Sequence, residues 1–137
     1  MKINQDISQL IERAKEASKN SYSPYSKFKV GAALINDKGQ IYSGCNVENL
    51  SFPAGICAEQ TAICKAVSEA GPDLKINILV VFTPTDDLTT PCGLCRQVIN
   101  EFATPATRII CVCNSNTQLD TTFDQLFPLS PTIKGLK

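Results

Sequence analysis

Three cysteines of the chain have the spacing of metal ligands. Cys92 and Cys95 are three positions apart at the predicted start of a helix, where side chains at i and i+3 share one face and can bind one ion together. Cys57 opens another predicted helix. A helix N-terminus favours thiolate over thiol because it presents free N–H groups and a partial positive charge. Three thiolates without an obvious fourth ligand indicate a zinc ion with one open coordination position, as in catalytic sites.

Glu59 is the candidate for acid–base chemistry beside such an ion. It follows Cys57 by two positions, and in the first turn of a helix both side chains can reach the space in front of the helix end. A carboxylate there can take a proton from a zinc-bound water and pass it on. The chain has no histidine, so a Ser–His or Cys–His nucleophile within one subunit is excluded.

Each of these residues also has an ordinary structural interpretation. A structural zinc knuckle at Cys92 and Cys95 is disfavoured, because a zinc ribbon needs a second Cys-x-x-Cys and the chain has none. Glu59 alone could simply interact with the helix dipole. Most cysteines in proteins are small buried side chains rather than ligands, and we expect this of the other four: Cys45, Cys64, Cys111 and Cys113.

The hydrophobic pattern predicts how the chain positions these residues. It indicates one α/β domain over residues 1–137, with a mixed five-stranded sheet and helices on both faces. Strands 76–83 and 108–113 are separated by one helix, so we expect them to be parallel. The other predicted strands span residues 28–35, 40–45 and 117–121. The predicted helices span residues 3–17, 56–70 and 92–102, and a last short helix follows a capping box formed by Thr122 and Gln125.

Composition excludes several classes of protein. Thirteen basic and thirteen acidic residues balance, so the basic surface of a nucleic-acid-binding protein is not visible. The longest apolar runs are too short for a membrane span, and the chain starts with an amphipathic pattern instead of a signal peptide. Seven cysteines, an odd number, do not indicate a disulfide framework. We therefore expect a soluble, cytoplasmic protein.

The motifs resemble a known family. Cys57-Ala58-Glu59, followed by Pro91-Cys92-Gly93-Leu94-Cys95, is similar to the signature of the zinc nucleoside and nucleobase deaminases. Further segments, from about residue 5 to Pro128, resemble the small homotetrameric cytidine deaminases: residues 22–33, 44–49, 59–63 and 92–98.

The resemblance implies a fold and an activity. The fold would be cytidine deaminase-like. The activity would be a hydrolase reaction of pyrimidine salvage, in which cytidine and deoxycytidine become uridine and deoxyuridine with release of ammonia. A zinc-bound hydroxide would attack C4 of cytosine, and Glu59 would shuttle protons.

It also implies roles for individual residues. One Zn²⁺ per chain would be bound by Cys57, Cys92 and Cys95. Phe28 would pack on the pyrimidine, the backbone N–H of Ala58 would bind the base carbonyl, and Asn46 and Glu48 would bind the ribose hydroxyls. Outside the motif, Phe28 would be assigned to the core, and Asn46 and Glu48 to a turn and the surface. The implied partners are a small nucleoside and three copies of the chain, in a homotetramer with shared active sites and without nucleic acid or membrane.

Two departures from the family pattern affect these expectations. Gln60 stands where relatives usually have arginine, so Arg96, directly after Cys95, is the candidate to balance the excess negative charge of three thiolates on one zinc. Relatives also place a C-terminal aromatic residue in a neighbour's active site. This chain lacks that pattern, and Phe127 or Ile133 would have to replace the residue.

Three other functions compete with this interpretation. A deaminase acting on a base within DNA or RNA should carry a basic surface, which the neutral chain does not. A non-catalytic, zinc-stabilised binding domain has no use for Glu59. A deaminase of a modified cytosine nucleoside, such as an antibiotic, is the nearest alternative, and the segment Asn46-Val47-Glu48-Asn49 favours an ordinary ribose over it.

Overall fold

One five-stranded sheet forms the centre of the molecule. The computed structural model describes residues 2–132. The strand order of the sheet is β2-β1-β3-β4-β5. β3 and β4 are parallel, as predicted, and all other neighbours are antiparallel. The mixed sheet is therefore confirmed, with the bounds β1 (Gly31–Asn36), β2 (Ile41–Cys45), β3 (Ile76–Phe82), β4 (Ala103–Val112) and β5 (Gln118–Thr122).

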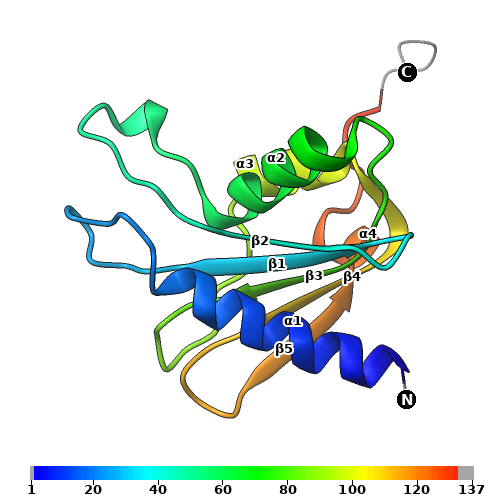
Figure 1. The fold of residues 1–137 in the computed structure, drawn as a ribbon, viewed down its shortest axis with the longest axis horizontal. Helices are drawn as coiled ribbons and strands as arrows, with labels where there is room; N and C mark the ends of the chain where they lie inside the picture. Colours follow the sequence, from blue (N-terminus) through cyan, green and yellow to red (C-terminus); the bar gives the residue numbers. More distant parts are fainter. Residues whose placement is uncertain (1, 133–137) are drawn as a thin grey trace.

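Helices cover both faces of this sheet (Figure 1). On one face lies α1 (Lys2–Ser18), whose Leu10 is fully buried against Val80 and other apolar side chains. On the other lie α2 (Ala58–Ala70), α3 (Gly93–Asn100) and α4 (Phe123–Leu126). Successive strand residues alternate between these two cores. No helix among residues 2–132 combines the length and apolar character needed to cross a bilayer.

The structure corrects several predicted boundaries. The first strand begins at Gly31 instead of residue 28, because the Asn46 side chain bonds to the Phe28 carbonyl and the Val30 N–H. The third predicted helix ends at Asn100, and β4 starts at once with Ala103.

The capping box predicted at the last helix is also wrong. Thr122 makes no side-chain capping bond; its hydroxyl bonds to Asp124, and the Thr121 hydroxyl donates to Gln125 at 2.9 Å. A capping box does occur at the start of α2, between Cys57 and Gln60.

A glycine in β2 lets α2 approach the sheet closely. A Cβ atom on Gly44 would lie 2.5 Å from the Ala62 nitrogen and 2.9 Å from the Ala58 carbonyl oxygen. Such distances are far inside van der Waals contact, so any other residue at this position would push α2 outward. The absence of a side chain at Gly44 therefore helps to set where α2 lies, and with it the position of Cys57.

Candidate metal centre and active site

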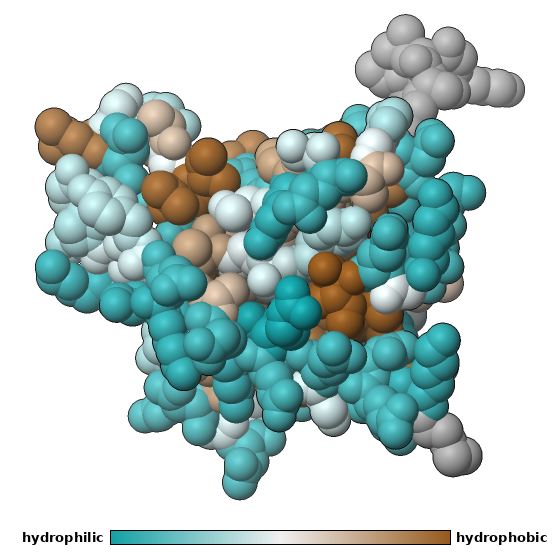
Figure 2. All heavy atoms as spheres, in the orientation of Figure 1, coloured by the Kyte–Doolittle hydropathy of each residue, from teal (hydrophilic) through white to brown (hydrophobic). Residues whose placement is uncertain are grey.

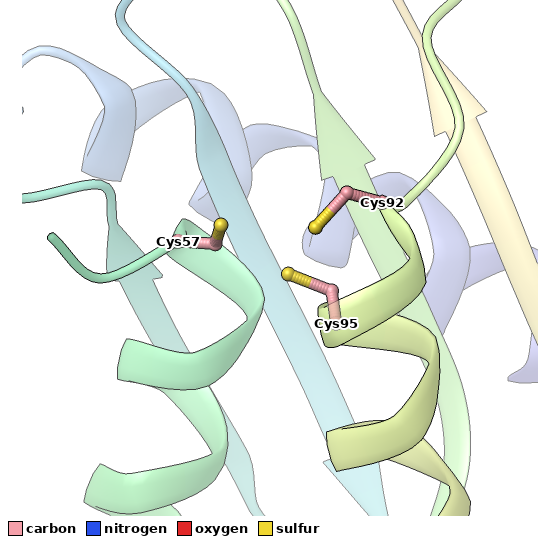
Figure 3. Close-up of side chains that lie close together, drawn as sticks. All are labelled: Cys57, Cys92 and Cys95. Atoms are coloured by element: carbon pink, nitrogen blue, oxygen red, sulfur yellow. The ribbon is translucent and has the colours of Figure 1, made fainter. Parts of the chain in front are cut away.

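The three predicted ligand cysteines meet at the starts of two helices. Cys57 is the N-cap residue of α2, Cys92 is the N-cap residue of α3, and Cys95 lies in the first turn of α3. Their Sγ atoms all lie within 4.8 Å of one another. Figure 3 shows the two helix starts side by side with the sulfur atoms turned toward a common point.

Hydrogen bonding between the sulfurs prepares the cluster for a cation. Hydrogen bonds from the Cys95 thiol and, more weakly, the Cys92 thiol lower the pKa of Cys57 to about 7, although burial and the nearby Glu59 carboxylate oppose the shift. Donation to Cys57, together with burial, raises the pKa of Cys95. The sulfurs thus share negative charge near neutral pH, and a bound metal takes the place of the thiol protons.

The geometry of the cluster fits zinc. Tetrahedral zinc–thiolate bonds of about 2.3 Å imply sulfur–sulfur distances of about 3.8 Å, so small side-chain rotations close the cluster around one ion. Cys95 is buried, Cys57 is half-buried and Cys92 is exposed, so the cluster opens toward solvent on one side. Within residues 2–132 no other group of three or more His, Cys, Asp or Glu side chains could hold a metal ion. Three ligands therefore leave a fourth position for water or substrate.

Glu59 is buried beside these sulfurs. Its side chain lies on α2 and is 5% exposed. Burial raises the pKa of this carboxyl group, while its own backbone N–H and the Cys95 thiol lower it. A carboxyl group in these surroundings is a stronger proton acceptor than one in water, as general acid–base catalysis requires. Ala58, which precedes it, is fully buried.

A pair of backbone hydrogen bonds brings Asn46, one of the predicted ribose ligands, alongside Cys57. Val47 and Ile56 exchange N–H···O bonds of 2.9 Å in both directions and form an antiparallel bridge. Asn46 and Cys57 therefore lie on the same side of this bridge, although they are eleven positions apart in the sequence. The segment between them, residues 47–56, projects from the body of the molecule (Figure 1).

Asn46 is held by three hydrogen bonds within the chain. Its Oδ1 accepts from the Ser21 hydroxyl and, at 2.9 Å, from the Val30 N–H, and its Nδ2 donates to the Phe28 carbonyl at 2.7 Å. The amide thereby fixes the backbone on both sides of Lys29, directly after Phe28. The ring of Phe28 is half-buried against the core. One N–H of Nδ2 is left to donate to a ligand.

Glu48 is held by the serine-rich loop that precedes β1. Its Oε1 accepts from the backbone N–H groups of Tyr25 and Ser26 at 3.0 and 3.1 Å, and Oε2 accepts from the Ser26 hydroxyl. These bonds, with that of the Ser26 hydroxyl the largest contribution, lower the pKa of Glu48, so the side chain is an anion at neutral pH. Sequence reasoning missed the orienting role of Ser21 and Ser26; the run of serines before β1 was the available signal.

The side chains of Gln60 and Arg96 form hydrogen bonds with backbone groups and one hydroxyl group. The Gln60 Oε1 accepts from the Cys57 N–H at 3.2 Å, which completes the capping box of α2. The three hydrogen bonds of the Arg96 guanidinium go to oxygen atoms of Thr90, Pro91 and Leu126. Neither side chain donates to a sulfur atom within the described part of the chain.

The other cysteines follow the structural interpretation in part. Cys111 and Cys113 are buried, as expected, but Cys45 is only half-buried and Cys64 is exposed. Cys64 was therefore predicted wrongly. The side chain of Phe127 packs on the core of its own chain and lies 6.0 Å from Phe123, ring centre to ring centre. Ile133, the other residue that would have to replace the C-terminal aromatic residue of the relatives, lies outside the described residues.

Comparison with known proteins identifies the family. A family model described as the cytidine and deoxycytidylate deaminase zinc-binding region matches residues 4–113. The chain belongs to this family. The family match confirms the zinc-binding deaminase domain that the motifs indicated, and Cys57, Cys92 and Cys95 are positioned to bind its zinc.

Individual deaminases show the same relationship. A cytidine deaminase from Sporosarcina psychrophila is 48% identical over 97 residues, which cover 71% of this chain and 70% of the relative. A blasticidin-S deaminase from Bacillus cereus is 31% identical over 136 residues, or 95% of each chain. The crystal structure of a cytidine deaminase from Burkholderia pseudomallei is 37% identical in sequence, with a TM-score of 0.84 over 90% of this chain and 97% of that one.

If Cys57, Cys92 and Cys95 bind one zinc ion together, replacing one of them should remove the metal. Removing Cys92 leaves two thiolates, and the two helix starts are then no longer linked through zinc, so Cys92→Ala should lose both zinc and stability. Metal analysis of the purified variant and its melting temperature test this. The matched control is Cys64→Ala on the exposed side of α2, which should retain one zinc per chain. Full zinc occupancy in Cys92→Ala would show that the assignment is wrong.

Proposed function

We propose that this protein hydrolyses the amino group of cytidine and deoxycytidine, giving uridine and deoxyuridine plus ammonia, as a step of pyrimidine salvage. The observation that carries the proposal is the buried carboxyl of Glu59 beside three convergent cysteine sulfurs. A structural zinc site needs no such carboxyl group, whereas hydrolytic deamination needs a group that accepts and returns protons. Family membership supports the same reaction.

Glu59 performs the proton transfers in this proposal. Zinc, when bound, supplies an activated water at neutral pH, because it lowers the pKa of water from about 15.7 toward about 7. The Glu59 carboxylate takes a proton from that water and donates it to N3 of cytosine, which makes C4 electrophilic. The oxygen of that water then forms a bond to C4. Glu59 carries the second proton of the same oxygen to the exocyclic amino group, and the C4–N bond breaks to release ammonia. Because Glu59 is buried, bulk water does not compete for these protons.

Residues at the other end of the site position the nucleoside. The remaining N–H of Asn46 and the anionic Glu48 are suited to the ribose hydroxyls, since a carboxylate accepts strong hydrogen bonds from them. The half-buried ring of Phe28 is suited to pack on the pyrimidine. The backbone N–H of Ala58, at the positive end of α2, is suited to the base carbonyl. The bridge between Val47 and Ile56 supports this division, because it joins the sugar end to the metal end.

Deamination of an antibiotic cytosine nucleoside is the second candidate. The specific observation in its favour is the blasticidin-S deaminase from Bacillus cereus, whose similarity extends over 95% of this chain. The paired amide and carboxylate of Asn46 and Glu48 favour an ordinary ribose instead.

The proton-shuttle role predicts the effect of one isosteric change. Glu59→Gln preserves the shape of the side chain but carries no proton, so turnover of cytidine should fall by about 10²–10⁴-fold or more while zinc and fold are kept. The loss of ultraviolet absorbance as cytidine becomes uridine measures turnover, and metal analysis measures zinc. Glu69→Gln, an exposed change at the far end of α2, is the control. Half of the normal activity in Glu59→Gln would contradict the role.

The sugar-binding role predicts a substrate-dependent effect at Glu48. One charged hydrogen bond is worth about 1.5–3 kcal/mol, so Glu48→Ala should reduce kcat/KM for cytidine by about one to two orders of magnitude, and should affect free cytosine much less. Glu69→Ala, which removes an exposed carboxylate at the far end of α2, is the control and should leave kcat/KM for both substrates unchanged. Equal losses for cytidine and cytosine would contradict ribose binding. Faster turnover of blasticidin S than of cytidine by the unaltered protein would favour the second candidate.

We further propose that the single domain of residues 1–137 acts in the cytoplasm as a homotetramer with shared active sites. All seven cysteines are free, which suits a reducing compartment. Leu50 and Phe52 on the projecting segment are each 78% exposed, and Figure 2 shows apolar side chains at that end of the molecule. The segment leads directly into Cys57, so a partner covering it would lie beside the metal site.

The assembly predicts a change of mass in solution. Sedimentation velocity should give four chains for the unaltered protein. Phe52→Ser should give smaller species because it removes exposed apolar surface that an interface would bury. Ile3→Ser, an exposed change on α1, is the control. A monomeric unaltered protein with full activity would contradict the proposal.

A further inference from the structure

Arg96 joins two segments of the chain that flank the metal site. Its Nε donates to the Pro91 carbonyl at 2.8 Å, one terminal nitrogen donates to the Thr90 hydroxyl at 2.9 Å, and the other donates to the Leu126 carbonyl at 2.7 Å. All three acceptors are neutral oxygens. The planar guanidinium can address them together because its donors are fixed in one fork.

The first two acceptors belong to the segment that carries Cys92. Within residues 2–132, Arg96 supplies the hydrogen bonds that hold Thr90 and Pro91. Its backbone N–H also donates to the Cys92 carbonyl at 2.9 Å, while Cys92 itself makes no side-chain capping bond. The Arg96 side chain therefore holds the carbonyl directly before Cys92, and a helical bond of α3 holds the carbonyl of Cys92 itself. Between these two fixed points, Cys92 must turn its sulfur toward Cys95 and Cys57.

The third acceptor is the last carbonyl of α4. Helix ends leave such carbonyls without a partner inside the helix, and an arginine side chain can satisfy them. α4 is anchored to the core by Phe123 and Leu126, which are both buried, and by the ring contact between Phe123 and Phe127. The hydrogen bonds of Arg96 thus connect this anchored helix to the segment that carries Cys92.

We propose that Arg96 is a positioning residue of the zinc centre, which holds Cys92 in ligating geometry through its planar fork and links that geometry to the docking of α4. This replaces the expectation that its charge balances the thiolates, since its donors face oxygen and not sulfur. The proposal concerns metal binding and is independent of the substrate.

The experiment separates fork geometry from charge. Zinc release from the holoenzyme to a colorimetric chelator is measured for Arg96→Lys and Arg96→Gln, together with the visible spectrum after cobalt(II) substitution. We expect both variants to release zinc about 10-fold faster or more, since groups that orient metal ligands typically contribute 10–100-fold to affinity. We also expect an altered cobalt spectrum in both, because lysine keeps the charge but not the fork. Normal zinc release in Arg96→Lys would overturn the proposal in favour of charge, and normal release in Arg96→Gln would exclude either role.

Two controls separate positioning from general loss of stability. Arg108→Gln removes another guanidinium, one that bonds to Asp120 on β5, and should leave zinc release unchanged. Leu10→Val weakens the core on the opposite face of the sheet and should lower the melting temperature without changing the cobalt spectrum. If Leu10→Val accelerates zinc release as much as Arg96→Gln at an equal loss of melting temperature, the effect is general destabilisation and the proposal is wrong.

A double-mutant cycle tests the link to α4. Phe127→Ala removes the ring that packs against Phe123, and it should accelerate zinc release when Arg96 is present. In the Arg96→Gln background the same change should have little further effect, because the connection is already broken. Strictly multiplicative effects of the two substitutions on the release rate would show that α4 and the metal site are not coupled through Arg96.

Discussion

The structure depends on the convergence of two helix N-termini on one cluster of sulfur atoms. Bringing three cysteines within 4.8 Å of one another concentrates negative charge as they deprotonate, and the free N–H groups at the starts of α2 and α3 offset only part of it. A divalent cation provides the remainder, so metal binding and the packing of the two helices stabilise each other. The position of Glu59 follows from the same arrangement, since it lies in the first turn of α2.

The rest of the fold holds those two helix starts in register. Gly44 lets α2 lie against β2, and the bridge between Val47 and Ile56 fixes the chain immediately before Cys57. On the α3 side, Arg96 fixes the carbonyls around Cys92. The serine-rich loop before β1 positions Asn46 and Glu48 in turn. The substrate-facing side chains of the proposed site are thus oriented by hydrogen bonds within the chain, before any ligand binds.

Sequence reasoning found the elements whose evidence is local. The run of apolar residues at 76–82 predicted the buried strand β3, and the Cys-x-x-Cys motif predicted the start of α3. Contacts between distant segments were not accessible in this way. The strand predicted from Phe28 starts three residues later because Asn46, eighteen positions downstream, binds that segment instead. The capping bond between Gln60 and the Cys57 N–H has no signal in the sequence pattern, and the exposure of Cys64 depends on which face of α2 meets the sheet.

X-ray absorption at the zinc edge counts the atoms bound to the metal, and it therefore tests whether the three cysteines form an open zinc site. We predict three sulfur atoms at about 2.3 Å and one oxygen or nitrogen atom at about 2.0–2.2 Å. Four sulfur atoms would indicate a closed, structural site without room for an activated water. Fewer than three sulfur atoms would show that Cys57, Cys92 and Cys95 do not bind the ion together, and the proposed chemistry would lose its basis.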